Sequence, residues 1–513
     1  MSESQGRLAA RVTAGILLTR ILGFVRERIF AHYFGDSPAA DAFRAALKIP
    51  NIIRNLLGEG TLSASFIPVY AGMIERGDED GARHVAGVIG SLLVLVTAAA
   101  AVLGFLLAPL ITDFAAPGFD EQRRTLTITL VEIMFPMSGL MIVSAWCLGI
   151  LNSHRRFFLS YAAPSVWNIV QIGTLVALGG IFMQQRLAIA LAWGALAGSV
   201  VQIAIQLPST LRSLGGVRWS VALDTPGVRR VIRAWLPVVF GAGVYQISSL
   251  VDQQLATFLV PGAVAILGYA QLVAILPVSL FGVSVAAVAL PELSREAVGT
   301  DAEILRMRVA SGTRRIAYFV LPSAAAFAAL APEILGALFQ TGEFGADETA
   351  IAAGVLAAYA IGIPAQASVK LFASGHYAFG DTRTPVRIAV LSVVVSAVSA
   401  FLLMQRFGPA GIALGAAIAA YLNSILNFAA LSRRLGRILD PDERKWIGVS
   451  TLALPPAVVA GLGTLALLDG TLQLQAAAGL GAFGLAYGGV TLLLKHPEAV
   501  RLARRRGRRE AHD

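Results

Sequence analysis

The sequence predicts an all-α, polytopic membrane protein with about 14 transmembrane helices, and its composition and its apolar runs are the observations that predict it. Hydrophobic residues make up 56% of the 513 residues and charged residues 14%, whereas a typical soluble protein is about 25% charged. So few charges cannot cover a soluble body of this size, and the apolar content excludes a disordered chain. Runs of about 20 apolar residues, long enough to cross a bilayer, recur along the chain.

Fourteen such runs are candidate spanning helices. They lie near 9–33, 39–73, 85–111, 126–152, 159–183, 187–208, 234–259, 264–291, 316–339, 349–373, 385–405, 410–431, 447–468 and 472–494. The first run is not a cleavable signal peptide, because Arg20, Arg26 and Arg28 interrupt it and no small-residue cleavage site follows.

The Lys and Arg residues are distributed unevenly between the loops that these runs define. Of the 41 cations, thirty fall in loops on one side of the membrane, four in loops on the other side, and seven inside the runs. The positive-inside rule therefore predicts that both termini lie in the cytoplasm. The net charge of +10 mostly reflects this topology, so no nucleic-acid partner is expected, and the basic tail should face solvent and lipid headgroups.

Prolines inside the runs indicate an internal repeat. Pro50 and Pro277 lie 227 residues apart, and Pro136 and Pro364 lie 228 apart, at corresponding runs. Chance remains the alternative, since the 22 prolines form many pairs. Six runs separate the copies, so duplication predicts two parallel six-helix lobes, an arrangement typical of transporters. The expected parts are an N-lobe (1–215), a C-lobe (216–440), a further helix pair (441–495) and a basic cytoplasmic tail (496–513).

The first two runs carry an unusual number of charges. An Arg or Lys at the middle of a spanning helix costs roughly 2.5–3.5 kcal/mol unless it is solvated or paired. Inside these two runs, the cations between residues 19 and 60 outnumber the acids Glu27, Asp41 and Glu59 by six to three; they are Arg20, Arg26, Arg28, Arg44, Lys48 and Arg54. We expect Asp41 to pair with Arg44 at i,i+3. The remaining surplus favours a water-accessible site for an anionic, phosphate-bearing substrate, and an internal salt-bridge network is the alternative.

Two further features bear on transport. Pro50 and the Gly58/Gly60 pair are expected to break the second run, as a hinge would require. Asp252 lies deep in the seventh run, where it is either a satisfied carboxyl group or a site for a coupling cation.

Metal and cofactor chemistry have little support in the sequence. The single cysteine, Cys147, rules out a disulfide, a thiolate zinc site and an iron–sulfur cluster within this chain. The six histidines include no helical pair at metal-ligand spacing, and the loop acids show no catalytic spacing. We expect no metal, no cofactor and no enzymatic activity.

Several segments resemble the MurJ/MviN family. They are TRILGFVRERIFAHYFG, ADAF, KIPNIIRNLLGEGTLSASFIPVY, APGF, LNSHRRFFLSYAAPSVWNI, LFQTGEF and SGHYAFGDTRTP, and they cover about residues 10 to 435. This family comprises the lipid II flippases of bacterial peptidoglycan synthesis, within the multidrug/oligosaccharidyl-lipid/polysaccharide exporter superfamily. The resemblance implies a multi-pass protein of the bacterial cytoplasmic (inner) membrane with fourteen spans, two six-helix lobes and alternating access. It also implies a final helix pair that forms a groove for the undecaprenyl tail.

The resemblance also implies roles for individual residues. The family's cavity arginines fall on Arg20, Arg26 and Arg54, its cavity aspartate on Asp41, and the acid of its EG segment on Glu59. With Lys48 from the charge argument, these residues form the predicted substrate site. Asp252 matches one acid of a cation site suggested for some members, which leaves sodium, a proton or the membrane potential as the expected coupling.

The sequence departs from the family pattern in the second half. Leu272 and Ile275 stand where Arg and Glu are implied on the eighth span, and residues 386–405 contain no acid. The main hypothesis is a flippase that moves lipid II from the inner to the outer leaflet for cell wall biogenesis. Its alternatives are a flippase for another undecaprenyl-linked glycan, a membrane enzyme acting on such lipids, and a non-transporting cell-wall scaffold. Expected partners are lipid II, membrane lipids and the cell-wall synthesis machinery.

Overall fold

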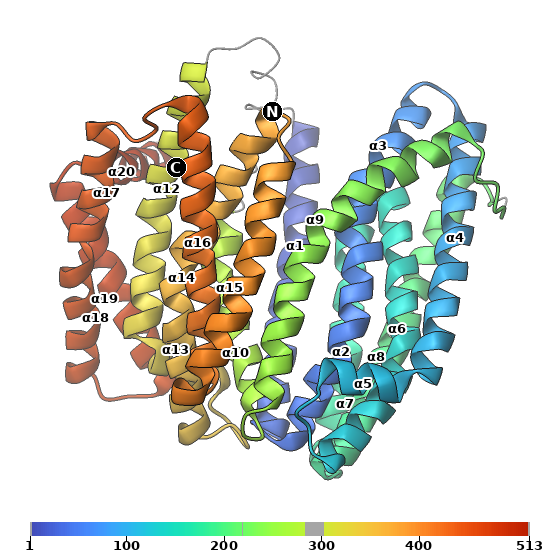
Figure 1. The fold of residues 1–513 in the computed structure, drawn as a ribbon, viewed down its shortest axis with the longest axis horizontal. Coiled ribbons are helices and arrows are strands. Elements are labelled where there is room, and N and C mark those ends of the chain that lie inside the picture. The colour runs from blue at the N-terminus through green and yellow to red at the C-terminus, as the bar shows by residue number, and fades with distance from the viewer. Residues whose placement is uncertain (1–2, 218, 283–301, 511–513) are drawn as a thin grey trace. The chain divides into compact units, whose positions relative to one another are not determined.

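The computed structural model describes residues 3–217, 219–282 and 302–510 (Figure 1). Within these ranges the chain forms helices joined by loops, and its extended pairing is an isolated antiparallel bridge between Thr341 and Phe344. The prediction of an all-α fold is confirmed.

The helices follow the predicted runs closely. The first nine are α1 (Glu3–Phe34), α2 (Pro38–Leu57), α3 (Glu59–Glu75), α4 (Glu79–Leu106), α5 (Ala108–Ala115), α6 (Glu121–Ser153), α7 (Phe157–Leu178), α8 (Gln184–Leu214) and α9 (Pro226–Thr257). The others are α10 (Ala263–Pro277) with the π-helical turn η1 (Val278–Gly282), α12 (Ala302–Ala329), α13 (Ala331–Phe339), α14 (Ala346–Ala378), α15 (Arg383–Phe407), α16 (Pro409–Leu435), α17 (Pro441–Leu452), α18 (Leu454–Leu467), α19 (Leu472–Leu493) and α20 (Pro497–Glu510). The end of the eighth run, 283–291, lies outside the described residues.

The number of spanning helices is lower by a strict criterion than the predicted 14. In the described ranges, 11 helices are long and apolar enough to cross a membrane, or 12 if the pair α12–α13, bent by 79°, is one span. The count of 14 is therefore not confirmed. Part of the difference comes from the second run, where α2 contains Asp41, Arg44, Lys48 and Arg54 within 20 residues and α3 is only 17 residues long.

Local sequence explains where several helices begin and end. Ser37 caps α2 by accepting a hydrogen bond from the Ala40 N–H, and Asp120 caps α6 in the same way through the Arg123 N–H. The second run breaks at Gly58, whose N–H donates to the Arg54 carbonyl oxygen at 2.7 Å. The expected break is thus confirmed at the glycine, whereas Pro50 lies inside α2.

The chain divides into two compact units. Unit 1 contains residues 1–265 and 341–344, and unit 2 contains residues 266–340 and 345–513. Unit 1 therefore includes α9, the seventh predicted span, because α9 packs against α2, α3 and α4. The predicted lobe boundaries follow the repeat rather than the packing of helices, and they remain a prediction.

Each unit is built around one long central helix. In unit 1, α6 packs against α2, α4 and α8, and its Trp146 is 1% exposed and donates from Nε1 to the Ala86 carbonyl oxygen at 3.1 Å. Cys147, the next residue, is fully buried. In unit 2, α14 packs against α12 and α16, and α18 and α19 form a pair beside α13 and α12.

Large apolar side chains cover much of the outer surface. On α15, for example, Val390, Val394 and Val398 are each more than half exposed. Contiguous apolar surface of this kind would be unfavourable in water, whereas it is the expected surface of a helix that faces lipid.

Candidate functional site

One acid links a cation of α1 to a cation of α2. The Glu27 carboxylate accepts a hydrogen bond from Arg26 Nη2 at 2.6 Å and from Arg44 Nη2 at 2.9 Å, so it connects the two helices. The Arg26 guanidinium also stacks over the Trp167 ring of α7, 4.8 Å from its centroid. Arg26 is therefore held on two sides, with its side chain 19% exposed.

This arrangement corrects one expectation. Arg44 pairs with Glu27 of α1, and Asp41 pairs with Arg123 of α6, so the predicted Asp41–Arg44 pair is wrong. An i,i+3 spacing makes a pair available but does not select it when partners on other helices offer better geometry.

Lys48 lies further along α2 and faces α9. Its Nζ donates a hydrogen bond to Ser249 Oγ at 2.6 Å. Asp252, three residues beyond Ser249 on the same helix, attracts the Lys48 ammonium electrostatically. The structure thus brings together Lys48 and Asp252, which the sequence analysis assigned to different roles.

The other predicted site residues lie on the same two helices or at their break. Arg20 is exposed on α1, and Arg54 is partly buried in the last turn of α2. Glu59 is the first residue of α3, and its side chain lies outside the described part of the structure. The roles of these residues in binding remain predictions.

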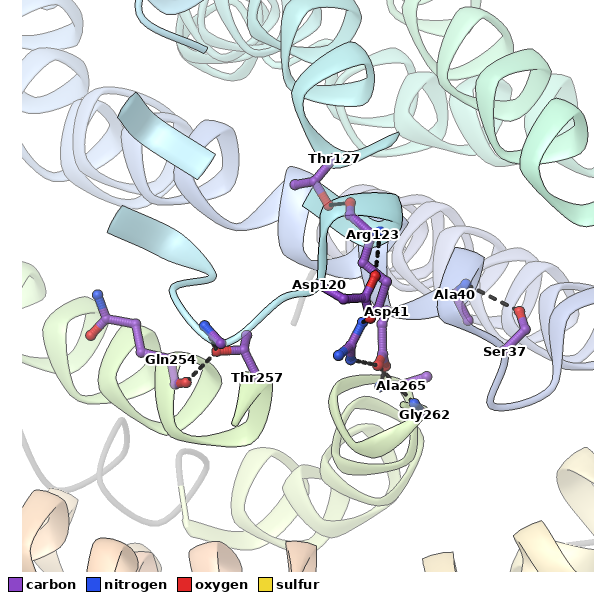
Figure 2. A network of polar contacts seen from close by, with 11 residues as sticks. Ser37, Ala40, Asp41, Asp120, Arg123, Thr127, Gln254, Thr257, Gly262 and Ala265 are labelled. Atoms are coloured by element: carbon purple, nitrogen blue, oxygen red, sulfur yellow. Dashed lines mark hydrogen bonds and ion pairs between the residues drawn. The ribbon is translucent and has the colours of Figure 1, made fainter. Parts of the chain in front are cut away.

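Asp41 is the most enclosed of the predicted site residues. Its side chain is fully buried, and its carboxylate accepts hydrogen bonds from the Gly262 N–H at 2.7 Å and the Ala265 N–H at 2.8 Å (Figure 2). Arg123 Nη1 lies 3.4 Å from the same carboxylate. Asp41 therefore caps the first turn of α10 from the first turn of α2, where the N–H groups and the helix dipole favour a negative charge.

The segment that leads into α6 belongs to the same network. Arg123 Nε donates to Asp120 Oδ2 at 2.7 Å, and the Gly118 N–H donates to Thr257 Oγ1 at 3.0 Å (Figure 2). The Arg123 N–H and guanidinium hold the pKa of Asp120 below its usual value. The APGF segment of the sequence (116–119) thus contacts the end of α9. Arg123 and Trp167 were not singled out in the sequence, because their partners are distant along the chain.

The second half has no comparable charge on its corresponding helix. Between Ala263 and Pro277, α10 contains no Asp, Glu, Lys or Arg, and Ile275 is 40% exposed. Leu272 and Ile275 thus leave this stretch apolar. No group of three or more His, Cys, Asp or Glu side chains suited to a metal ion occurs in the described ranges.

Sequence comparison places these features in a family. A family model described as "Lipid II flippase MurJ" matches residues 30–473. The chain belongs to the MurJ family. It is 35% identical over 434 residues to a probable lipid II flippase MurJ of Rhizobium meliloti, a match that covers 82% of this chain and 79% of the relative. It is 32% identical over 437 residues to lipid II flippase MurJ of Burkholderia cenocepacia, covering 83% and 84% of the two chains.

Solved structures of MurJ and its superfamily share the fold. The chain is similar to a lipid II flippase MurJ in an inward closed conformation, with a TM-score of 0.77 and 22% identity over 94% of this chain and 99% of that one. It is also similar to an inward-facing MATE multidrug resistance transporter of the MOP superfamily, with a TM-score of 0.69 and 14% identity over 84% and 98%. The predicted family is confirmed, and a MurJ-family chain with these apolar helices is a multi-pass inner-membrane protein.

Proposed function

We propose that this chain is a lipid II flippase, which moves the undecaprenyl-pyrophosphate-linked disaccharide-peptide from the inner to the outer leaflet by alternating access. The observation that carries the proposal is the set of cations on α1 and α2, in a chain of the MurJ family. Both termini would then lie in the cytoplasm, as the distribution of Lys and Arg predicts. The cell-wall synthesis machinery is the expected protein partner.

Arg20, Arg26, Lys48 and Arg54 would bind the pyrophosphate. Guanidinium groups match phosphate oxygens in two-point geometry, and a charge-assisted hydrogen bond contributes roughly 1.5–3 kcal/mol. The contacts of Arg26 with Glu27 and Trp167 support this role, because they hold the guanidinium in one orientation before the ligand arrives. The apolar pair α18–α19 would accommodate the lipid tail, and no catalytic role is assigned to any residue.

Asp41 would have a different task from direct contact with the substrate. Its carboxylate is already occupied by two N–H groups and Arg123, so we assign it to fastening the first turn of α10 to α2. Glu59 would act at the break between α2 and α3.

The membrane potential would assist the return of the unloaded protein. Outward-facing surplus cations move inward with the field, which contributes about 2.3 kcal/mol per charge for each 100 mV. A sodium or proton gradient is the second source of energy, with Asp252 as the residue to test.

Rescue of a flippase-depleted host tests the proposal. We expect this chain to restore growth and the Arg26→Ala variant to fail at equal membrane abundance. Arg186→Ala removes an exposed arginine outside α1 and α2 and serves as the matched control, which should rescue fully. If the Arg26→Ala variant restored growth, Arg26 would not be needed to bind the pyrophosphate.

A flippase for another undecaprenyl-linked glycan is the second candidate. The uncharged α10, with Leu272 and Ile275, favours it, because part of the family pattern for the substrate head is missing. Lipid intermediates that accumulate on depletion separate the candidates: lipid II supports the first, and a different lipid-linked sugar supports the second.

A further inference from the structure

Lys48 of α2 makes a polar contact with α9 one helical turn from Asp252, within unit 1. The Lys48 ammonium of α2 donates to Ser249 Oγ of α9 at 2.6 Å. Asp252 follows Ser249 by three residues, which places both side chains on the same face of α9, one turn apart. The ammonium of α2 therefore bonds a hydroxyl of α9 one turn from the Asp252 carboxylate, which attracts it electrostatically.

The Asp252 carboxylate depends on the positive charge of Lys48. Its Oδ1 atom is buried and has no hydrogen-bond partner in the described part of the chain. Among the same residues, Lys48 is the charged group that acts on it. A buried carboxylate requires a nearby counter-charge, because its desolvation is otherwise uncompensated. Lys48 supplies that charge.

Lys48 is also one of the cations that the proposed function assigns to the pyrophosphate. A pyrophosphate group and the Asp252 carboxylate are both anions, and they repel each other when they approach the same ammonium. Binding of the substrate and retention of the α9 contact are therefore competing states of a single lysine.

We propose that Lys48 and Asp252 form a latch between α2 and α9 that the anionic head of the substrate releases. Ser249 holds the ammonium by a hydrogen bond and Asp252 attracts it by charge while the protein is unloaded, and the pyrophosphate binds the ammonium instead when the substrate arrives. Release of Lys48 removes this polar contact between α9 and α2, so substrate binding frees α9 to move. This inference rests on the proposed function and describes how its binding site is regulated.

The latch makes a prediction that a merely structural ion pair does not make. Asp252→Asn removes the competing charge while it preserves the shape of the side chain, so the variant should bind the substrate head more tightly than the wild type. We expect a gain of about fivefold or more, the lower end of typical coupling between two sites. A structural pair would instead leave affinity unchanged or lower it.

Binding of undecaprenyl pyrophosphate to the purified full chain in nanodiscs provides the measurement. Lys48→Met should weaken binding, and the double variant should bind as Lys48→Met does, because Asp252 acts through Lys48. Glu132→Gln removes a carboxylate from α6 instead and is the matched control, with affinity unchanged. Thermal unfolding of each variant verifies that it is folded.

The outcomes separate this proposal from the proposed function. Loss of binding in Arg26→Ala together with an unchanged or weaker Asp252→Asn would overturn the latch and leave the flippase assignment standing. A gain from Asp252→Asn that persists in the Lys48→Met background would also overturn it, because Asp252 would then repel the ligand directly. If the wild-type chain did not bind undecaprenyl pyrophosphate, both the latch and the proposed function would be overturned.

Discussion

The two units of the chain carry their charged side chains in different places. In unit 1, cations lie within the helices α1 and α2, and the sequence from Arg20 to Glu59 holds six cations and four acids. In unit 2, charged pairs fasten the starts of two helices to a third: Arg314, near the middle of α12, contacts Glu443 at the start of α17 at 2.6 Å and Glu498 at the start of α20 at 3.5 Å.

The difference distinguishes charged residues that pack helices together from charged residues that are available to bind a ligand. Arg314 is paired with two acids of its own unit and connects three helices, so it serves the packing of unit 2. The cations of α1 and α2 exceed their acids, and Asp41 is committed to Arg123 and to backbone N–H groups rather than to them. A cation surplus inside a membrane protein is expensive, which makes it a better indicator of a ligand than any balanced pair.

The strongest test of the comparison is ligand affinity. We expect single substitutions Arg20→Ala, Arg26→Ala and Arg54→Ala each to weaken undecaprenyl pyrophosphate binding by about tenfold or more, because each removes a charge-assisted hydrogen bond. Arg314→Ala should leave the affinity unchanged. Equal losses from both groups would show that the two units do not differ in this respect.

Asp41 tests whether unit 1 also contains charge that serves packing. Asp41→Ala leaves Arg123 Nη1 and the N–H groups of Gly262 and Ala265 without their acceptor, so we expect about 3–5 kcal/mol of destabilisation. Asp41→Asn keeps an oxygen acceptor and should cost less. Thermal unfolding of the purified variants measures both, and an Asp41→Ala variant of wild-type stability would contradict the capping role.

In unit 2, Arg314→Ala should lower stability by about 1–3 kcal/mol, because Glu443 and Glu498 lose a partner in a partly buried site. The start of α20 should also loosen. Limited trypsin digestion reports this directly, since α20 is rich in arginine, and cleavage there should be faster than in the wild type. If the rate of cleavage were unchanged, Arg314 would not be what holds the start of α20 in place.

The smallest expected effect is a pH dependence in unit 2. His496, between α19 and α20, is fully buried against Tyr318, and its Nδ1 accepts a hydrogen bond from the Glu498 N–H at 3.2 Å. Burial lowers its pKa to about 4, with Arg314 acting in the same direction and Glu498 opposing it.

The folded state therefore resists a proton that the unfolded chain accepts near its ordinary pKa of about 6.5. Stability is retained above that pH and falls as the pH drops from about 6.5 towards 4. His496→Gln should reduce this fall in the melting temperature. A profile identical to that of the wild type would exclude His496 as its source.

The sequence predicted the elements of this fold well and their partners poorly. Hydropathy located the helices, and Gly58 marked the break between α2 and α3, because both signals are local. The pairing of Arg44 with Glu27 and the capping of α10 by Asp41 join residues that are 17 and more than 220 positions apart. Backbone N–H groups carry no side-chain signature, so Asp41 could be recognised as important but not assigned its acceptor role.

Lys48 illustrates the same limit at the candidate site. Its charge in a spanning helix singled it out, and Asp252 was singled out for the same reason. Their proximity depends on how α9 packs against α2, which composition and spacing do not determine. The family pattern and the charge count predicted the site residues. The packing of the helices shows which of them already have hydrogen-bond partners within the protein, as Lys48 and Asp41 do.

The burial of Cys147 has a practical consequence for measuring the proposed release of α9 from α2. The chain has one thiol, and it lies fully enclosed in α6 beside Trp146. A water-soluble maleimide should therefore leave the wild-type protein unmodified under native conditions. Single cysteines introduced on α2 or α9 could be labelled without first removing a native residue, so the movement of α9 can be followed in an otherwise unaltered sequence.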